Sequence, residues 1–206
     1  LTSLAPPMIT VITAVTSEDT SLPPVHLANY PSVQALAHEK ATLARVVPKG
    51  GTVILNADDP RVFAMRHETQ AHVVTYGETD VADVRLLSSR VTGRETSVGL
   101  VPEGLEVKIQ YFHRHLSFTV PGIFGRSLAY SLCAALAVAE ALDLQDGAEK
   151  MLVEHFTPLP GRVRIIPGKN GITLLDDSYN AAPASVMSGL RDLASLELRP
   201  AQRRIA

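Results

Sequence analysis

Three short apolar runs rich in β-branched residues recur in the first part of the chain, with segments of a different period between them. The runs are MITVIT (8–13), TVILN (52–56) and AHVVTYG (71–77). A continuous apolar run of this length is typical of a strand buried on both faces, as in a parallel sheet. The intervening segments are SVQALAHEKATLARVV (32–47), with Ser32 as its expected N-cap, and a short stretch that begins at Pro60; both have helical features. The order strand, helix, strand, helix, strand predicts a parallel sheet covered by helices.

The pattern changes further along the chain. Residues 82–120 alternate polar and apolar side chains in short runs such as EVKIQYF, which predicts antiparallel strands with one solvated face. The alanine-rich stretch 127–142 predicts a closely packed helix, and a shorter helix is expected near 146–156. We therefore predict an α/β fold with a mostly parallel sheet, flanking helices and a small antiparallel β subdomain.

A domain boundary is expected at TPLPGR (157–162), because two prolines and a glycine in six residues are typical of a linker. After it, a Gly-Lys-Asn-Gly turn between two apolar runs predicts a hairpin, and a helix follows. We assign 1–157 to one domain and 158–206 to the start of a second. The first residue is not Met, and the final RRIA looks like the beginning of a strand. We therefore expect an internal piece of a longer protein.

Composition excludes several classes of protein. The net charge of -2 argues against a nucleic-acid partner, which would require a basic excess. No run reaches the roughly 18 apolar residues that span a membrane, and the apolar opening lacks the basic flank of a signal peptide. Cys133 is the one cysteine, which excludes a disulfide framework and fits a reducing compartment. We expect a cytoplasmic protein with no membrane partner.

Lys40 interrupts the apolar stripe of the 32–47 helix. The apolar positions of this stripe are Val33, Leu36, Ala37, Leu43, Ala44 and Val47. A lysine at such a place extends its ammonium to water, pairs with a carboxylate, or loses its charge because desolvation lowers its pKa. A neutral amine can also react with carbon dioxide to give a carbamate, an anionic oxygen ligand for Mg²⁺.

His26 precedes Lys40 by 14 residues, at the end of the loop after the first apolar run. Ligands gather at the carboxyl ends of strands in open α/β sheets, so this loop and the helix face could converge. On its own, a loop histidine is more often a solvated side chain.

Acidic residues follow two of the apolar runs. Asp58 and Asp59 in NADDP could bind a metal or a hydroxyl, or could cap the helix behind Pro60; we favour the structural role. Asp176 and Asp177, with Asn180, lie at a strand-to-helix turn, where such side chains also cap helices. Arg162, which leaves a Pro-Gly turn, suits a phosphate clamp; the alternative is an exposed linker arginine.

Taken in order, these pieces resemble the Mur ligases of peptidoglycan synthesis. The segments that carry the resemblance are PPVHLANYPSVQALAHEKATL, GGTVILNADDP, VPGIFGRSLAYSLCAALAVAEAL, LPGR and LLDDSYNAAPASVMSGL. DDSYNAAP after PGR is most similar to the type that adds D-alanyl-D-alanine to UDP-N-acetylmuramoyl-tripeptide. The resemblance covers the whole chain, as the later part of a central ATPase domain and the start of a Rossmann-like C-terminal domain.

The resemblance implies a set of roles. Lys40 matches the carbamylated lysine of the family and His26 its Mg²⁺-binding histidine, so both are candidate catalytic residues and metal ligands. Arg162 and Asp177 match residues that contact the nucleotide. Ser178 and Asn180 lie in the segment that faces the incoming amine. The cofactors implied are ATP and Mg²⁺, and the full-length protein is expected to be a monomer.

The implied reaction is electrostatic in character. ATP phosphorylates a substrate carboxylate to an acyl phosphate, and an amine attacks it. A tetrahedral oxyanion forms, and phosphate leaves as the amide closes. Mg²⁺ and protein cations must neutralise the charge of the transferring phosphoryl group.

Two departures from the family pattern stand out. Where the family commonly has a histidine and asparagines at the adenine site, this chain has Ser127, Leu128 and Ser131. These two serines remain candidate nucleotide-binding residues, with adenine bound more weakly or differently. The chain also has no Gly-x-x-Gly-Lys-Thr phosphate loop, so we expect that loop to precede Leu1 and the chain alone not to ligate.

Two other readings remain open. One is another member of the superfamily: a different Mur ligase, a folylpolyglutamate synthase or a cyanophycin synthetase. The other is a catalytically inactive Mur-like domain kept as a binding module, which the loss of the histidine and asparagines favours and which His26, Lys40, Arg162 and Asp177 oppose.

Overall fold

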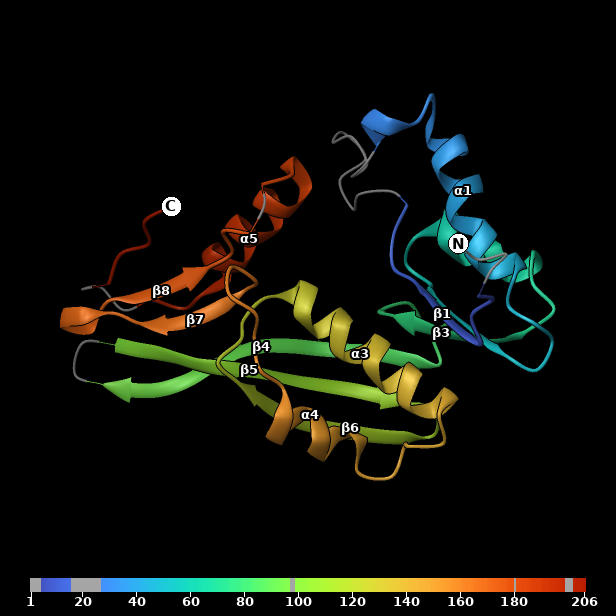
Figure 1. The fold of residues 1–206 in the computed structure, drawn as a ribbon. Coiled ribbons are helices and arrows are strands. Elements are labelled where there is room, and N and C mark those ends of the chain that lie inside the picture. The colour runs from blue at the N-terminus through green and yellow to red at the C-terminus, as the bar shows by residue number, and fades with distance from the viewer. Residues whose placement is uncertain (1–4, 16–26, 97–98, 180, 199–201) are drawn as a thin grey trace.

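The computed structural model describes residues 5–15, 27–96, 99–179, 181–198 and 202–206. Within these ranges, six strands form one sheet in the order in which they occur along the chain (Figure 1). The strands are β1 (Ile9–Ile12), β2 (Thr52–Asn56), β3 (His72–Gly77), β4 (Val84–Thr96), β5 (Gly99–Tyr111) and β6 (Arg114–Pro121).

The sheet changes from parallel to antiparallel at β4. β1 to β4 pair in parallel, but the β3–β4 contact is short, with Tyr76 opposite Val84 and Gly77 opposite Arg85. β4, β5 and β6 are antiparallel neighbours. The predicted fold class is thus confirmed, and the antiparallel strands extend the parallel sheet.

Helices cover both faces of the sheet because side chains alternate along the buried strands. Ile54 of β2 packs in one apolar cluster with Leu132 and Leu136 of α3 (Arg126–Ala141). Val53, the residue before Ile54, packs in a second cluster with Leu36 of α1 (Val33–Arg45). The shorter α2 (Pro60–Ala64) joins the α1 face and α4 (Ala148–His155) the α3 face. Among the residues described, no helix is both long and apolar enough to cross a membrane.

The C-terminal part follows the predicted hairpin and helix. β7 (Arg164–Pro167) and β8 (Thr173–Asp176) pair antiparallel, and α5 (Pro183–Ser195) follows. Asn170 in the turn has a φ of 56°, a left-handed conformation that asparagine tolerates. The expected strand at the end of the chain is wrong for residues 202–206, which are irregular.

This part contacts the larger sheet through the backbone before α3. The Phe124 amide donates to the Val163 carbonyl at 3.2 Å, and the Ile165 amide donates to the Gly122 carbonyl at 2.9 Å. Phe124, Val163 and Ile165 form a small buried cluster at the junction. Figure 1 shows α5 and the β7–β8 pair beside the N-terminal end of α3. The boundary near 157 remains a prediction.

Candidate functional site

The interrupted stripe of α1 differs in one detail from the expectation. Ser32 caps the helix as predicted, since its Oγ accepts from the Ala35 amide at 3.1 Å. Leu43 is 37% exposed, so the prediction that it belongs to the buried stripe is wrong. Ala41, which was not assigned to the stripe, is buried. Leu36, Ala41 and Ala44 are buried, whereas Lys40 is half-buried, so Lys40 lies at the edge of the buried face.

Lys40 points toward the end of the first strand and does not extend freely to water. Its Nζ donates to the carbonyl oxygen of Ala14 at 2.5 Å, just beyond β1, and the side chain is half-buried. Desolvation lowers the pKa of the Lys40 ammonium, and the negative charge of Asp59 partly opposes this shift. The structure therefore places a lysine whose pKa is lowered at the carboxyl end of β1. His26, its predicted partner, lies outside the described residues.

Asp59 has the structural role that the sequence favours. It is 5% exposed and caps α2, with Oδ1 accepting from the amides of Arg61 at 2.9 Å and Val62 at 3.2 Å. Its Oδ2 accepts from the Val15 amide at 2.6 Å. One carboxylate thus ties the end of β1 to the start of α2, beside Lys40.

Asp58 also has a structural role, because its carboxylate binds the backbone that follows β3. Its carboxylate accepts from the backbone amides of Glu78 at 2.6 Å and Thr79 at 2.9 Å, and from the Tyr130 hydroxyl at 2.5 Å. Burial alone would raise the pKa of Asp58, but these hydrogen bonds outweigh it and lower the pKa. Burial and the bond to Asp58 raise the pKa of Tyr130, which keeps this hydroxyl protonated as a donor.

Arg126 extends this network to the first turn of α3. Its guanidinium forms a double hydrogen bond with the Glu78 carboxylate, at 2.7 and 2.9 Å, and donates to the Tyr130 hydroxyl at 2.8 Å. Its backbone amide donates to Asp192 of α5 at 3.2 Å. Sequence patterns did not predict these contacts, because they join positions 48 to 72 residues apart.

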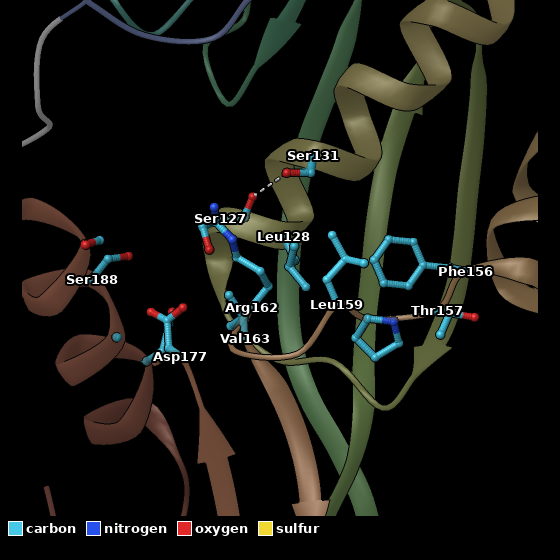
Figure 2. A pocket seen from close by; sticks show the side chains of 14 residues that line it. Ser127, Leu128, Ser131, Phe156, Thr157, Leu159, Arg162, Val163, Asp177 and Ser188 are labelled. Atoms are coloured by element: carbon cyan, nitrogen blue, oxygen red, sulfur yellow. Dashed lines mark hydrogen bonds between the residues drawn. The ribbon is translucent and has the colours of Figure 1, made fainter. Parts of the chain in front are cut away.

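A cavity of about 580 Å³ lies between α3, the predicted linker and α5 (Figure 2). It brings together four predicted site residues from separate segments: Ser127 and Ser131 of α3, Arg162, and Asp177 beyond β8. The other lining residues are Leu128, Phe156, Thr157, Pro158, Leu159, Val163, Ser185, Ser188, Gly189 and Asp192.

α5 contributes one helical face to this cavity. Ser185, Ser188, Gly189 and Asp192 follow the spacing i, i+3, i+4, i+7, which places small and polar side chains on one side of a helix. The signal was present in the sequence. It was missed because small polar residues on a helix are normally read as its solvated face.

The loop that carries Arg162 is held against the end of β8. Gly161 has a φ of 72°, and a Cβ there would lie 2.8 Å from the backbone nitrogen of Tyr179. Its amide donates to Asp176 at 3.0 Å. The Arg162 guanidinium lies 3.8 Å from the centre of the Tyr179 ring, a cation–π contact. Glycine at 161 thus permits the close approach that positions Arg162.

Asp177 lies half-buried beside Arg162. Burial raises the pKa of its carboxyl, while the Val163 amide and the charge of Arg162 act in the opposite direction. Ser178 does not line the cavity, because its hydroxyl donates to Asp176 at 2.7 Å in an exposed turn. Asn180 lies outside the described residues.

The described residues include no group of three or more His, Cys, Asp or Glu side chains placed to hold a metal ion. Asp58 and Asp59 already accept hydrogen bonds from backbone amides.

Comparison with known proteins identifies similar sequences over most of the chain. A family model described as the Mur ligase middle domain matches residues 1–139. The UDP-N-acetylmuramoyl-tripeptide–D-alanyl-D-alanine ligase of Mycobacterium bovis is 30% identical over 97% of this chain and 36% of its own length. The UDP-N-acetylmuramoylalanine–D-glutamate ligase of Nitrosomonas europaea is 33% identical over 91% of this chain and 36% of its own length. The chain spans about a third of the length of these curated relatives.

Solved structures show the same fold. MurF from Acinetobacter baumannii superposes with a TM-score of 0.72 at 18% identity, over 93% of this chain and 38% of that one. MurF ligase from Thermotoga maritima in complex with ADP gives a TM-score of 0.71 at 18% identity, over 94% of this chain and 40% of that one.

Proposed function

The chain belongs to the Mur ligase family, and from this membership we propose that it forms the nucleotide-facing part of a longer ATP-dependent ligase of peptidoglycan synthesis. The observation that carries the proposal is the cavity between α3 and α5. It is lined by all four candidate nucleotide-binding residues, which come from separate segments of the chain: Ser127, Ser131, Arg162 and Asp177. Its volume of about 580 Å³ falls within the ordinary range for small-molecule sites.

Within the family, we propose the type that adds D-alanyl-D-alanine to UDP-N-acetylmuramoyl-tripeptide. The name of the Mycobacterium bovis relative and the DDSYNAAP segment support this assignment. Ligases that add L-alanine or D-glutamate match at 30% and 33% identity, so another Mur activity is the alternative. We further propose a cytoplasmic monomer with no nucleic-acid or membrane partner.

The residues of this chain would act mainly through charge. Arg162 is exposed at the cavity, where its guanidinium would pair with phosphate oxygens. Asp177 would accept hydrogen bonds from the ribose hydroxyls. The charges of Arg162 and of Mg²⁺ would offset the negative charge that accumulates as a phosphoryl group passes to the substrate carboxylate.

Lys40 and His26 would hold Mg²⁺, which supplies electrostatic stabilisation of phosphate oxygens when it is bound. The half-buried, desolvated amine of Lys40 fits carbamate formation, because only the neutral amine attacks carbon dioxide. In that step the nitrogen lone pair forms a bond to carbon, the π pair of one C=O bond moves to oxygen, and one N–H proton of the amine leaves to solvent. The hydrogen bond to Ala14 would hold the modified nitrogen at the end of β1.

Substitution Arg162→Ala tests the cavity directly. We expect it to weaken ADP binding to residues 1–206 at least tenfold, because a hydrogen bond to a charged group contributes about 1.5–3 kcal/mol. Isothermal titration calorimetry of both proteins measures the difference. Arg61→Ala, at an exposed arginine of α2, is the matched control. Equal ADP affinity in the Arg162→Ala and unmodified proteins would contradict nucleotide binding in this cavity.

A further inference from the structure

Helix α3 begins at a residue that cannot cap it. Gly125 occupies the N-cap position and has no side chain to accept from the first amides of the helix. Those amides have no partner within the helix, and a Ser, Thr, Asp or Asn at the N-cap normally accepts from one of them. Here the acceptor comes from α5. Asp192 Oδ1 accepts from the Arg126 amide at 3.2 Å, although the two residues are 66 positions apart in the chain.

The carboxylate of Asp192 occupies the space that a side chain at position 125 would need. A Cβ at Gly125 would lie 2.6 Å from Asp192 Oδ2, which is closer than unbonded atoms pack. The φ of 92° at Gly125 also favours glycine. Glycine therefore admits the carboxylate to the start of α3, where the partial positive charge of a helix N-terminus favours an anion.

The first turn of α3 is held from its other side as well. The Arg126 guanidinium pairs with the Glu78 carboxylate, and the Tyr130 hydroxyl donates to Asp58. These bonds tie α3 to the segment that follows β3. Asp192 thus connects α5 to a part of the backbone whose position is already fixed.

Apolar packing contributes little to the attachment of α5. Of the described residues 183–195, none is buried, and Val186, Met187 and Leu190 are 38–43% exposed. The polar face of α5, which carries Ser185 and Ser188, is the one that lines the cavity. Because burial of apolar surface is the main force that holds most helices in place, a polar contact has to supply much of what keeps α5 beside α3 (Figure 1).

We propose that Asp192 is a positioning residue, which fixes α5 as a wall of the cavity by capping α3 across the junction. Asp192 lines the cavity of about 580 Å³ and also a second cavity of about 570 Å³, to which Gly125 and Arg126 contribute. Its contact with α3 therefore lies where the two cavities meet, and loss of the cap releases α5 from α3. This role of Asp192 does not depend on what the cavity binds, so its failure would leave the proposed function standing.

Amide hydrogen exchange of residues 1–206, followed by NMR, tests the cap. In Asp192→Ala we expect the Arg126 amide to exchange at least about tenfold faster than in the unmodified chain, because its acceptor is lost. Asp192→Ser draws the oxygen back toward α5 and is a second variant with the same expected result. Asp192→Asn retains an acceptor oxygen and should exchange at the unmodified rate. The Leu132 amide, within α3, should keep its rate in every variant and shows that the helix remains folded.

Two results of this exchange experiment would overturn the cap. One is an Arg126 amide that exchanges equally slowly in Asp192→Ala, Asp192→Ser and the unmodified chain. The other is an Asp192→Asn variant that exchanges as fast as Asp192→Ala, because an amide oxygen serves as a cap as well as a carboxylate does.

The position of α5 is measured separately, as the distance between spin labels at Leu190→Cys of α5 and Ser117→Cys of β6. Both positions are exposed, whereas Cys133, the one native cysteine, is buried and takes no label. We expect Asp192→Ala to at least double the width of the distance distribution and Asp192→Asn to leave it unchanged. Asp80→Ala, at an exposed aspartate outside α5, is the matched control. An equally narrow distribution at the same distance in Asp192→Ala would overturn the positioning role.

Discussion

Replacing Lys40 by alanine in the complete ligase should reduce turnover by about a hundred- to a thousandfold, the scale on which loss of a preorganised electrostatic group slows a reaction. The amine lies at the carboxyl end of β1, held by the Ala14 carbonyl at 2.5 Å, where desolvation lowers its pKa. Alanine removes the nitrogen that would carry the carbamate, so added bicarbonate should not restore activity. Phosphate release measured under saturating substrates gives the rate.

Two controls keep this result interpretable. Lys49→Ala alters an exposed lysine in the turn after α1 and should leave the rate unchanged. Urea unfolding of Lys40→Ala and Lys40→Met separates lost chemistry from lost structure, since methionine retains much of the apolar stem. A normal rate in stable Lys40→Ala would reduce Lys40 to a structural contact with β1.

Substitution Asp58→Ala should lower the free energy of unfolding by about 2–4 kcal/mol, because it leaves two backbone amides and the Tyr130 hydroxyl without their acceptor. Urea denaturation at neutral pH measures the change. Asp80→Ala, at an exposed position two residues beyond Glu78, should change the stability by less than about 0.5 kcal/mol.

The same carboxylate gives the stability of the fold a defined pH dependence. The folded-state pKa of Asp58 is lowered, so its contribution is present above the unfolded pKa of about 3.9 and is lost as pH falls through the folded pKa. Asp58→Ala should therefore lose less stability than the unmodified chain on acidification from pH 5 to pH 3. Parallel acid sensitivity in the two proteins would contradict this role.

Local structure follows closely from the sequence. The strand TVILN was predicted at the bounds it has, and Ser32 and Asp59 cap helices as their residue types favour. These features depend on neighbours within a few positions, whose chemistry the sequence displays directly. The error at Leu43 arose where helical spacing allows either of two adjacent positions, Leu43 or Ala44, to face the core, and packing in the cluster with β1 and β2 buries Ala44.

The contacts between segments far apart in the chain could not be predicted from the sequence. The antiparallel strands join the parallel sheet through only two residue pairs between β3 and β4, and no periodicity marks such a short pairing. Likewise, the bond from Tyr130 to Asp58 and that from Arg126 to Glu78 join distant segments. Arg162 and Asp177 were singled out by motif, but their placement opposite Ser127 and Ser131 depends on how α5 packs beside α3.

The most direct measurement is ATP-dependent phosphate release by the complete ligase with three pairs of acceptor and amine: UDP-N-acetylmuramoyl-tripeptide with D-alanyl-D-alanine, UDP-N-acetylmuramate with L-alanine, and UDP-N-acetylmuramoylalanine with D-glutamate. We predict release with D-alanyl-D-alanine, none above background with L-alanine or D-glutamate, and none from residues 1–206 alone, where the sequence has no Gly-x-x-Gly-Lys-Thr loop. Release with another amine would support ligase activity but contradict the proposed substrate type. No release with any amine would contradict the proposed ligase activity and favour a Mur-like binding module.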